Sequence, residues 1–306
     1  MSRPLLRDEY KMARHFPSLR ENSGYSARTS MFIQDAALPV IPTAAFDDDE
    51  CKVELSGSDQ EKVKAASLLT KLSRDRHGSI QKVATGAINE VAANLAWRGR
   101  VFYELVDRGD AEIVPNRFTS ERLLVTPFFC IQSIPKEDRR LWKKRLGFLW
   151  SHQFWRVAMP STLGGPCGYS KVLRRLNRYD TLGPNFFRKG LEQGNISDEF
   201  DFQEYSYNID VFMNHVSRTW GWNRRDSGQD RATEYYYFYK TAQFHRAQAI
   251  LREHILVEIN ALLQRLNIQS QVAISGVISS EEIKKKIEAL EVGEINFEDL
   301  SQILAN

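Results

Sequence analysis

Apolar residues recur at helical spacing over one long stretch near the end of the chain. Between about residues 234 and 266 they step by seven, four, four, three and four positions: Phe244, Leu251, Ile255, Ile259, Leu262 and Leu266. This stripe predicts one continuous helix, which at 1.5 Å per residue would be roughly 50 Å long. A helix of that length crosses a whole domain or takes part in an oligomer.

Two amphipathic helices are predicted in the first third of the chain. One covers residues 59–72, and a longer one follows Ser79. Ser79 has a side chain that caps helix N-termini, and Gly99 stands where a left-handed C-cap residue is expected. The ends of the second helix therefore carry local signals in addition to the apolar periodicity.

The pattern becomes typical of strands at residues 100–107. A turn containing Gly109 leads into residues 111–114, which predicts a β-hairpin. Residues 123–126 and 128–134 are expected to form further short strands, separated by a proline. Because helices and strands do not alternate regularly, we predict an α+β fold that is mostly helical, with a small antiparallel sheet and the long C-terminal helix.

The middle of the chain is less clear. Residues 136–155 fit a helix and a strand equally well. Residues 159–169 contain two prolines and three glycines, which predict a loop. Ser170 is then expected to cap a helix that ends near residue 179.

These patterns divide the chain into three regions. Residues 1–60 lack strong periodicity and are predicted to form an extended or partly disordered N-terminal arm with one short helix. Residues 61–270 are predicted to form the α+β core, and residues 271–306 a small helical tail. In the tail, Ser279 and Glu282 have the spacing of a capping box.

The composition is that of a globular protein. Of the 306 residues, 42% are apolar and 26% are charged, which excludes wholesale disorder. No apolar segment has the length of a signal-peptide core or a membrane span, so we expect a cytoplasmic protein, or a virion protein if the chain comes from a phage. The three cysteines are far apart, which favours a reducing compartment and buried or half-buried thiols.

The net charge of +3 gives no reason to expect a polyanionic partner, but the positive charge is unevenly distributed. A basic region with Trp142, Trp150 and Trp155 covers residues 136–178. Its cations are Lys136, Arg139, Arg140, Lys143, Lys144, Arg145, Arg156, Lys171, Arg174, Arg175 and Arg178. Cations neutralise phosphates and tryptophans stack on bases, which favours contact with nucleic acid. The alternative is a solvated basic face above buried tryptophans.

No catalytic, cofactor-binding or metal site is predicted. The six histidines form no metal-binding motif, and His245 and His254 lie on opposite sides of the long helix. Carboxylates of the predicted hairpin are the candidates for holding a divalent cation: Glu104, Asp107, Asp110 and Glu112. Such ligands serve metal-dependent nucleases. The alternative is that these carboxylates are ordinary solvated charges.

Two further segments have a functional and a structural interpretation. The glycine-rich residues 163–168 lack the ending of a phosphate-binding P-loop, which favours a plain connection. Residues 235–239 are four tyrosines and a phenylalanine, so an element built from them is apolar on every side. That pattern predicts burial, either in the core or between subunits.

The order of several segments resembles bacteriophage portal proteins. A helix ends in a glycine and leads into a hairpin (LAWRGRVFYELVDRGDAEIVP), and proline-bounded strands follow. Next come a loop and helix (P-x-x-L-G-G-x-x-G-Y-S-K-V-L), then FFRKGLEQG, VSRTWGWN and the long helix. The resemblance covers about residues 79–266. It implies a non-enzymatic, ring-forming protein with a DNA-facing basic surface, for which the candidates are Arg139, Lys143, Lys144, Arg174 and Arg175.

Three functional hypotheses follow. The first is a portal-like structural protein that assembles as a homo-oligomer and contacts DNA, without a cofactor or a membrane. The alternative is a monomeric nucleic-acid-binding protein of a phage-defence or mobile-element type. The third is a metal-dependent nuclease that uses Glu104, Asp110 or Glu112.

Overall fold

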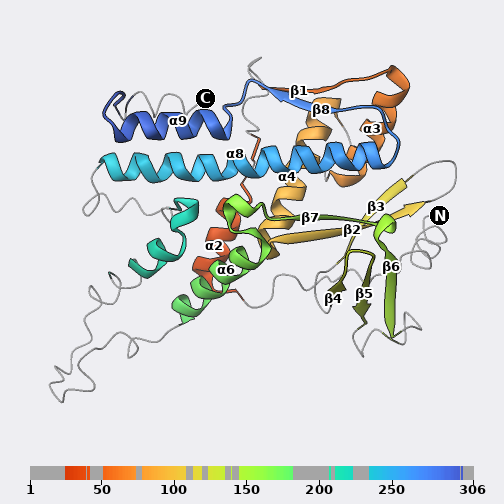
Figure 1. Ribbon diagram of the computed structural model, residues 1–306, viewed down its shortest axis with the longest axis horizontal. Helices are drawn as coiled ribbons and strands as arrows, with labels where there is room; N and C mark the ends of the chain where they lie inside the picture. The colour runs from red at the N-terminus through yellow and green to blue at the C-terminus, as the bar shows by residue number, and fades with distance from the viewer. Residues whose placement is uncertain are drawn as a thin grey trace. The chain divides into compact units, whose positions relative to one another are not determined.

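The computed structural model describes residues 25–38, 40–41, 51–73, 78–107, 113–118, 123–134, 139, 145–181, 207, 211–222, 234–296 and 298. They form an α+β fold that is mostly helical, which confirms the predicted fold class (Figure 1). The chain groups into two compact units. The described residues of the first unit fall within 37–159 and 252–277, and those of the second within 24–36, 160–251 and 278–306.

Two helices of the first unit pack against each other, α3 (Asp59–Leu72) and α4 (Ile80–Arg98). Each begins after a serine, Ser58 or Ser79, whose hydroxyl accepts a hydrogen bond from the third backbone N–H of the helix. Gly99 ends α4 with a φ of 71°, a conformation that glycine adopts without strain. Both helices, and the caps at Ser79 and Gly99, confirm the sequence prediction.

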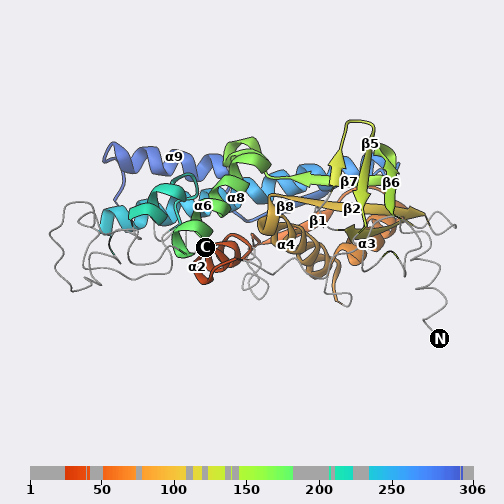
Figure 2. The same cartoon turned by 90° about the horizontal axis from the view of Figure 1, so that it is seen from below.

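The predicted hairpin belongs to a three-stranded antiparallel sheet of the order β3-β2-β7 (Figure 1; Figure 2). Its central strand is β2 (Arg100–Asp107), flanked by β3 (Ile113–Phe118) and β7 (Phe154–Ala158). The pairing of β2 with β3 confirms the hairpin. The return strand lies a few residues later than the sequence indicated, and the turn at Gly109 lies outside the described residues.

A second antiparallel sheet has the order β4-β5-β6. Its strands are β4 (Leu123–Val125), β5 (Phe129–Ser133) and β6 (Leu146–Trp150). Where residues 136–155 left helix and strand open, the described part is the helical Arg139, then Arg145, β6, the 3₁₀ turn η2 (Ser151–Gln153) and the start of β7. The core between the two sheets consists of Phe102, Phe118, Cys130, Leu149 and Phe154.

The long helix predicted near the end of the chain is confirmed as α8 (Glu234–Arg265). Its 32 residues correspond to about 48 Å at 1.5 Å per residue. The apolar stripe from Leu251 to Leu262 is almost completely buried. Asn260 on this helix exchanges two hydrogen bonds with the backbone of Val272. That contact positions β8 (Val272–Ser275), which pairs antiparallel with β1 (Lys52–Leu55).

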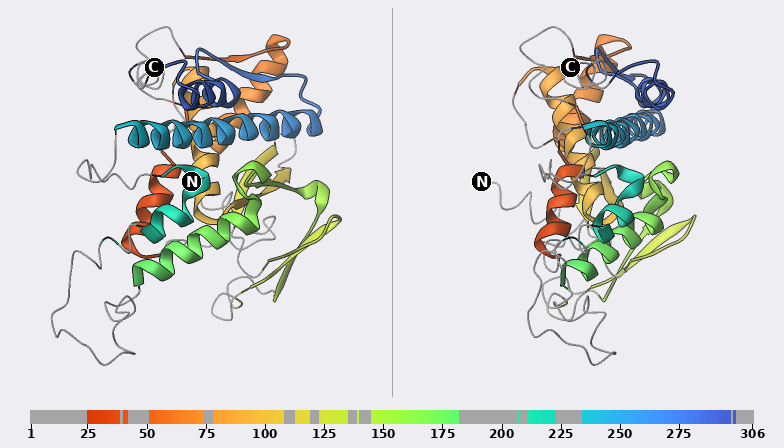
Figure 3. Two further views of the ribbon diagram at one scale, coloured as in Figure 1. Left: turned by 60° about the vertical axis from the view of Figure 1, so that its left-hand side comes forward. Right: turned by 90° about the vertical axis from the view of Figure 1, so that its left-hand side faces the viewer.

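In the second unit, α2 (Ala27–Ala36) lies beside α6 (Gly165–Thr181) (Figure 3). Four buried aromatic side chains form the core of this unit, with ring centroids 5.2–6.1 Å apart: Phe32, Tyr169, Trp220 and Trp222. Trp220 belongs to a 3₁₀ turn, η5 (Arg218–Trp220). Aromatic rings at these distances add to the stabilisation that their buried area provides.

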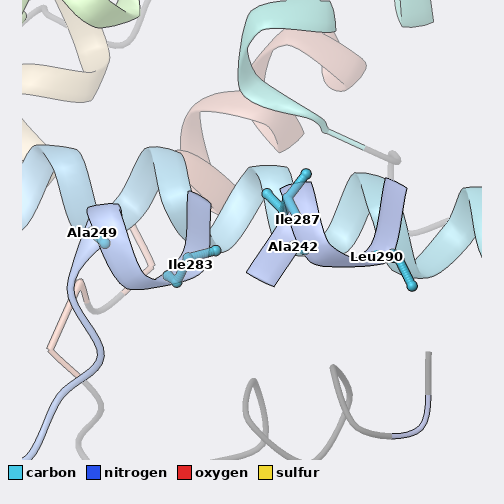
Figure 4. Packing of buried hydrophobic residues seen from close by; sticks show 5 residues of the cluster. All are labelled: Ala242, Ala249, Ile283, Ile287 and Leu290. Atoms are coloured by element: carbon cyan, nitrogen blue, oxygen red, sulfur yellow. The ribbon is translucent and has the colours of Figure 1, made fainter. Parts of the chain in front are cut away.

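Helix α9 (Ser280–Glu291) also belongs to the second unit and lies along α8 (Figure 4). The contact is a cluster of small and branched apolar side chains: Ala242, Ala249, Ile283, Ile287 and Leu290. The three residues from α9 are spaced by four and three positions, so they share one helix face. The predicted capping box of Ser279 and Glu282 is confirmed.

Helix α6 begins at Gly165, so the prediction of a loop up to Ser170 is wrong. Gly164, with a φ of 92°, makes the turn into the helix. Pro166 is compatible with the first helical turn because the backbone N–H groups there have no helical partner. The helix extends to Thr181, close to the predicted end.

The aromatic run at residues 235–239 is only partly packed in a core, with Tyr239 against the cluster between α8 and α9. Tyr235, Tyr236 and Tyr237 are 43–44% exposed at the start of α8, so an intramolecular core is the wrong interpretation for them. Cys167 is likewise exposed, although Cys51 and Cys130 are buried as expected.

No helix among the described residues combines the length and the apolar character that crossing a membrane requires. Within residues 1–60 the structure describes α2 and β1. The division of the chain at residues 60 and 270 remains a prediction.

Candidate functional site

The β4-β5-β6 sheet is apolar on both of its faces. Alternate residues of a strand point to opposite faces, and Cys130, Gln132 and Leu149 face the core with at most 1% exposure. The opposite face is formed by Leu124, Phe129, Ile131, Phe148 and Trp150, which the strand register brings together. We call these five residues, together with Phe128 of the β4–β5 turn, the aromatic face.

Three rings of the aromatic face contact one another. Trp150 meets Phe148 edge-on with centroids 4.9 Å apart, and Phe129 lies 5.4 Å from Phe148. Trp150 remains 49% exposed, and Phe128 71% exposed. An antiparallel sheet with one face in the core commonly carries polar residues on the other. A solvent-facing cluster of aromatic rings therefore indicates a binding surface.

Positive charge is concentrated around the aromatic face. Residues 123–158, which include all three strands, contain seven Lys and Arg and two acidic residues, a net +5, whereas the whole chain carries +3. Both acidic residues are in the segment that joins β5 to β6. The three strands carry no carboxylate, so the aromatic face itself has no acidic group to repel an anion.

The β4–β5 turn links the aromatic face to the start of η2. The Thr126 hydroxyl donates to the carbonyl of Phe129 and accepts from its N–H, which closes the turn. The backbone N–H of Ser151 donates to the carbonyl of Phe128 at 2.8 Å. This bond holds the exposed Phe128 beside Trp150, the residue that precedes Ser151.

A cleft of about 480 Å³ adjoins this turn. It is bounded by the β4–β5 turn, by η2 and β7, and by the last turns of α8, all within the first unit. Its polar lining comes from Thr126, Ser151, Trp155, Arg156, Glu258 and Arg265. Two arginines and one glutamate give this lining a positive balance.

Arg265, at the end of α8, is an exposed residue whose guanidinium contacts the protein backbone. Its Nη2 donates to the backbone carbonyls of Phe154 at 2.8 Å and His152 at 3.4 Å. Partial burial of the guanidinium lowers the pKa of Arg265, because the charged form loses part of its contact with water. Arg156 projects from β7 and is likewise exposed.

The described members of the proposed DNA-facing set belong to both units. Arg139 belongs to the β5–β6 connection, where its Nε donates to the carbonyl of Ile134 at the end of β5. Lys143 and Lys144 lie outside the described residues. Arg174 and Arg175 belong to the other unit, on α6.

Helix α6 presents a separate basic surface. Lys171, Arg174, Arg175 and Arg178 are exposed and follow the spacing i, i+3, i+4 and i+7, so they share one helix face. Leu173 and Leu176 are buried on the side that faces the core of the second unit. The arrangement is that of an amphipathic helix, for which a solvated basic face is a sufficient explanation.

The hairpin carboxylates are separated. Glu104 is 4% exposed and lies opposite Asn116, so it is not the solvated charge that one interpretation expected, whereas Asp107 at the strand end is exposed. Asp110 and Glu112 lie outside the described residues. Within the described ranges, no three His, Cys, Asp or Glu side chains come together as metal ligands.

The two histidines of α8 have separate environments. His254 Nε2 lies 2.8 Å from the carbonyl oxygen of Ala158 and donates to it, which ties α8 to β7. Burial lowers the pKa of His245.

No protein-family model, curated protein or solved structure matches this chain. The candidate site therefore depends on the geometry of its own residues.

Sequence reasoning identified the basic region and Trp150 but not the aromatic face. The available signal was that Leu146, Phe148 and Trp150 occupy every second position of β6 and so share one face, but Leu149 between them is also apolar, so the pattern does not show which face is exposed. Arg265 was missed because its setting depends on β7, more than a hundred residues earlier in the chain.

Proposed function

We propose that this protein binds single-stranded nucleic acid on the aromatic face of the β4-β5-β6 sheet. The observation that carries the proposal is the grouping of the exposed Phe128 and Trp150 with the half-buried Phe148 on a sheet that lacks carboxylates. Aromatic rings stack on bases of any sequence, with roughly 1–3 kcal/mol for each base by alanine substitution. Bases are available for such stacking in a single strand and not in a duplex.

The charge distribution supports the same class of ligand. The β5–β6 connection contains Arg139, Lys143 and Lys144, and it joins two strands of the aromatic face. Cations beside a stacking surface attract the phosphate backbone and release its counterions. An apolar protein partner would account for the exposed rings but would give no reason for the excess of positive charge.

A second candidate function is assembly of a homo-oligomer, as the resemblance to portal proteins implies. It is favoured by the exposed Tyr235, Tyr236 and Tyr237 at the start of α8. Tyrosine is enriched at protein interfaces. Contiguous exposed apolar surface on a protein often marks an interaction site. DNA contact by Arg174 and Arg175 of α6 belongs to this second candidate.

Two substitutions distinguish the candidates, and each is the control for the other. Trp150→Ala removes an exposed ring from the aromatic face, and Tyr237→Ala removes an exposed ring from the tyrosine run. We expect Trp150→Ala to weaken the binding of labelled oligo(dT) or oligo(U) by about 1 kcal/mol or more, measured by fluorescence anisotropy. Tyr237→Ala should leave this affinity unchanged and lower the sedimentation coefficient if the chain self-associates.

The proposed function fails if the wild-type protein does not bind either oligonucleotide at low salt. It also fails if a duplex of the same length binds more tightly than the single strand, because stacked and paired bases cannot occupy the aromatic face.

A further inference from the structure

One side of α8 brings an acid and a base to the cleft beside the aromatic face. Four residues of this helix line the cleft, with the spacing i, i+3, i+4 and i+7: Glu258, Ala261, Leu262 and Arg265. Residues at this spacing share one helix face. The carboxylate and the guanidinium come from positions two turns apart, roughly 10 Å along the helix axis. Apolar side chains therefore separate the two charges.

The acid and the base do not pair with each other. Nη2 of Arg265 donates to two backbone carbonyls, and its Nε–H and Nη1–H groups have no partner among the described residues. Oε1 of Glu258 lies 4.0 Å from Nε2 of His254, but that nitrogen donates to the carbonyl of Ala158. Within the described ranges, the carboxylate thus accepts no hydrogen bond. The helix offers acceptors at one end of the cleft and donors at the other.

The rest of the cleft suits a flat, largely apolar ligand. Val125, Pro127 and Phe154 add apolar lining. Ligand sites commonly have volumes of about 300–1,000 Å³, mostly apolar walls and a few polar groups that fix orientation, and this cleft measures about 480 Å³. Glu258 opposes the binding of a simple anion. A neutral ring with acceptors on one edge and donors on another can use both charged groups.

We infer that the cleft binds a guanine base. Guanine has two acceptors on one edge, O6 and N7, which are the atoms that arginine contacts most often in base recognition. It also has an amino donor, N2, on another edge, for which Glu258 supplies the acceptor. Adenine has an amino group beside N7, so it would set a donor against the guanidinium of Arg265.

The inference rests on the proposed function for the source of the base, which is the strand that stacks on the aromatic face. Ser151 lines the cleft, and its N–H donates to the carbonyl of the exposed Phe128. Trp150 directly precedes Ser151 in the chain. The cleft therefore adjoins the aromatic face, and a base next to the stacked ones can enter it.

Glu258 and Arg265 could instead be ordinary solvated charges of α8, and that alternative gives a different expectation. The affinity for a strand would then not depend on the amino group of guanine. Substitution of Glu258 would not change the preference among bases.

The first experiment compares two oligonucleotides by fluorescence anisotropy, a dT tract with one central dG and the same tract with dI, whose base lacks only the N2 amino group. The wild type should bind the dG strand about tenfold more tightly. Glu258→Ala should remove this difference, and alanine, as a strong helix former, should keep α8 intact. Glu54→Ala removes an exposed carboxylate from β1 in the same unit, and this control should retain the difference.

The second experiment tests Arg265 with a dT tract that contains 7-deaza-dG, which lacks N7. The wild type should bind this strand about tenfold more weakly than the dG strand. Arg265→Lys keeps the positive charge and loses the planar guanidinium, so it should reduce the ratio. An unchanged ratio in a folded Arg265→Lys variant would contradict the assignment of N7 to Arg265.

The third experiment titrates guanosine and inosine into the wild type and into Glu258→Ala by calorimetry, without any oligonucleotide. Its results separate the two proposals. Equal affinities of the wild type for dG and dI strands, or a preference that persists in Glu258→Ala, overturn the guanine site even if dT tracts bind the aromatic face. Glu258-dependent binding of guanosine without binding of any oligonucleotide supports the site with a free nucleoside as its ligand, and the proposed function then fails. If neither guanosine nor any oligonucleotide binds, both proposals fail.

Discussion

The indole N–H of Trp222 donates a hydrogen bond of 2.7 Å to the carboxylate of Asp35, a residue 187 positions earlier in the chain. Trp222 is 1% exposed and Asp35 is 4% exposed. The side chain of Gln248 donates to the backbone carbonyl of the same aspartate. Asp35 therefore connects α2, the end of η5 and α8 within the second unit.

Loss of the Asp35 carboxylate is expected to destabilise the second unit. Asp35→Ala leaves the buried indole N–H of Trp222 without an acceptor, at a cost of about 1–3 kcal/mol. Asp35→Asn retains an acceptor oxygen and should cost less. Urea unfolding followed by tryptophan fluorescence measures both, and equal midpoints for the two variants would contradict this account.

Gly221 is expected to tolerate no side chain. Its φ is +67°, and a Cβ would lie 2.6 Å from the carbonyl oxygen of Lys240 and 2.6 Å from the Cβ of Gln243. Gly221→Ala should therefore lower the unfolding free energy by more than about 1 kcal/mol. Gly168→Ala is the matched control, because a Cβ there meets nothing within 4 Å and alanine favours the helix. It should be neutral or slightly stabilising in the same unfolding experiment.

The cap of α9 should make the stability of this helix dependent on pH. The hydroxyl and the N–H of Ser279 both donate to Glu282 and hold the pKa of that carboxyl below its ordinary value of 4.5. A lowered folded-state pKa contributes stability above the unfolded-state pKa, and this contribution is lost as the pH falls through the folded-state pKa.

Ser279→Ala should consequently shift the urea midpoint at neutral pH and have a smaller effect at an acidic pH below the folded-state pKa of Glu282, where the carboxyl is protonated in both states. The loss at neutral pH is that of a helix N-cap. A shift of the same size at both pH values would show that the carboxylate does not contribute.

The three thiols should react at very different rates. Cys167 is exposed at the start of α6, whereas Cys51 and Cys130 are buried. Burial raises the pKa of Cys130 to about 12 and also raises that of Cys51, which suppresses the reactive thiolate. At mildly alkaline pH, a thiol reagent should label one cysteine rapidly in the native protein and all three in denaturant. Cys167→Ser should abolish the rapid phase, and its persistence would show that a buried thiol is accessible.

The elements that could be predicted from the sequence are those with signals at their ends. Ser79 and Gly99 mark α4, and the capping box of Ser279 and Glu282 marks α9. Helix α8 was predictable because its apolar stripe, from Phe244 to Leu266, extends over roughly six turns, which averages out the low helix propensity of single residues. The start of α6 could not be predicted, because glycine and proline are equally compatible with a loop and with a first helical turn.

The candidate site was only partly predictable. The excess of cations from Lys136 to Arg156 is visible in the sequence. The exposure of Trp150 and the partial exposure of Phe148 are not visible there, because a strand that is apolar at every position is typical of a fully buried strand. The cleft required the pairing of β7 with β2 and the contact of Arg265 with Phe154, and both join segments that are distant in sequence.

The two faces of the β4-β5-β6 sheet differ in the amino-acid substitutions that they tolerate. Residues such as Cys130 and Leu149 are fixed by their fit to the core, and a shift of one position would exchange them for Phe129 and Trp150 without any change in hydrophobicity. The turn before β5 contributes to the correct alignment, because both the hydroxyl and the backbone N–H of Thr126 bond to Phe129 there. Once that alignment is set, the outward rings can be replaced one at a time, so ligand preference can evolve on this surface while the interior stays intact.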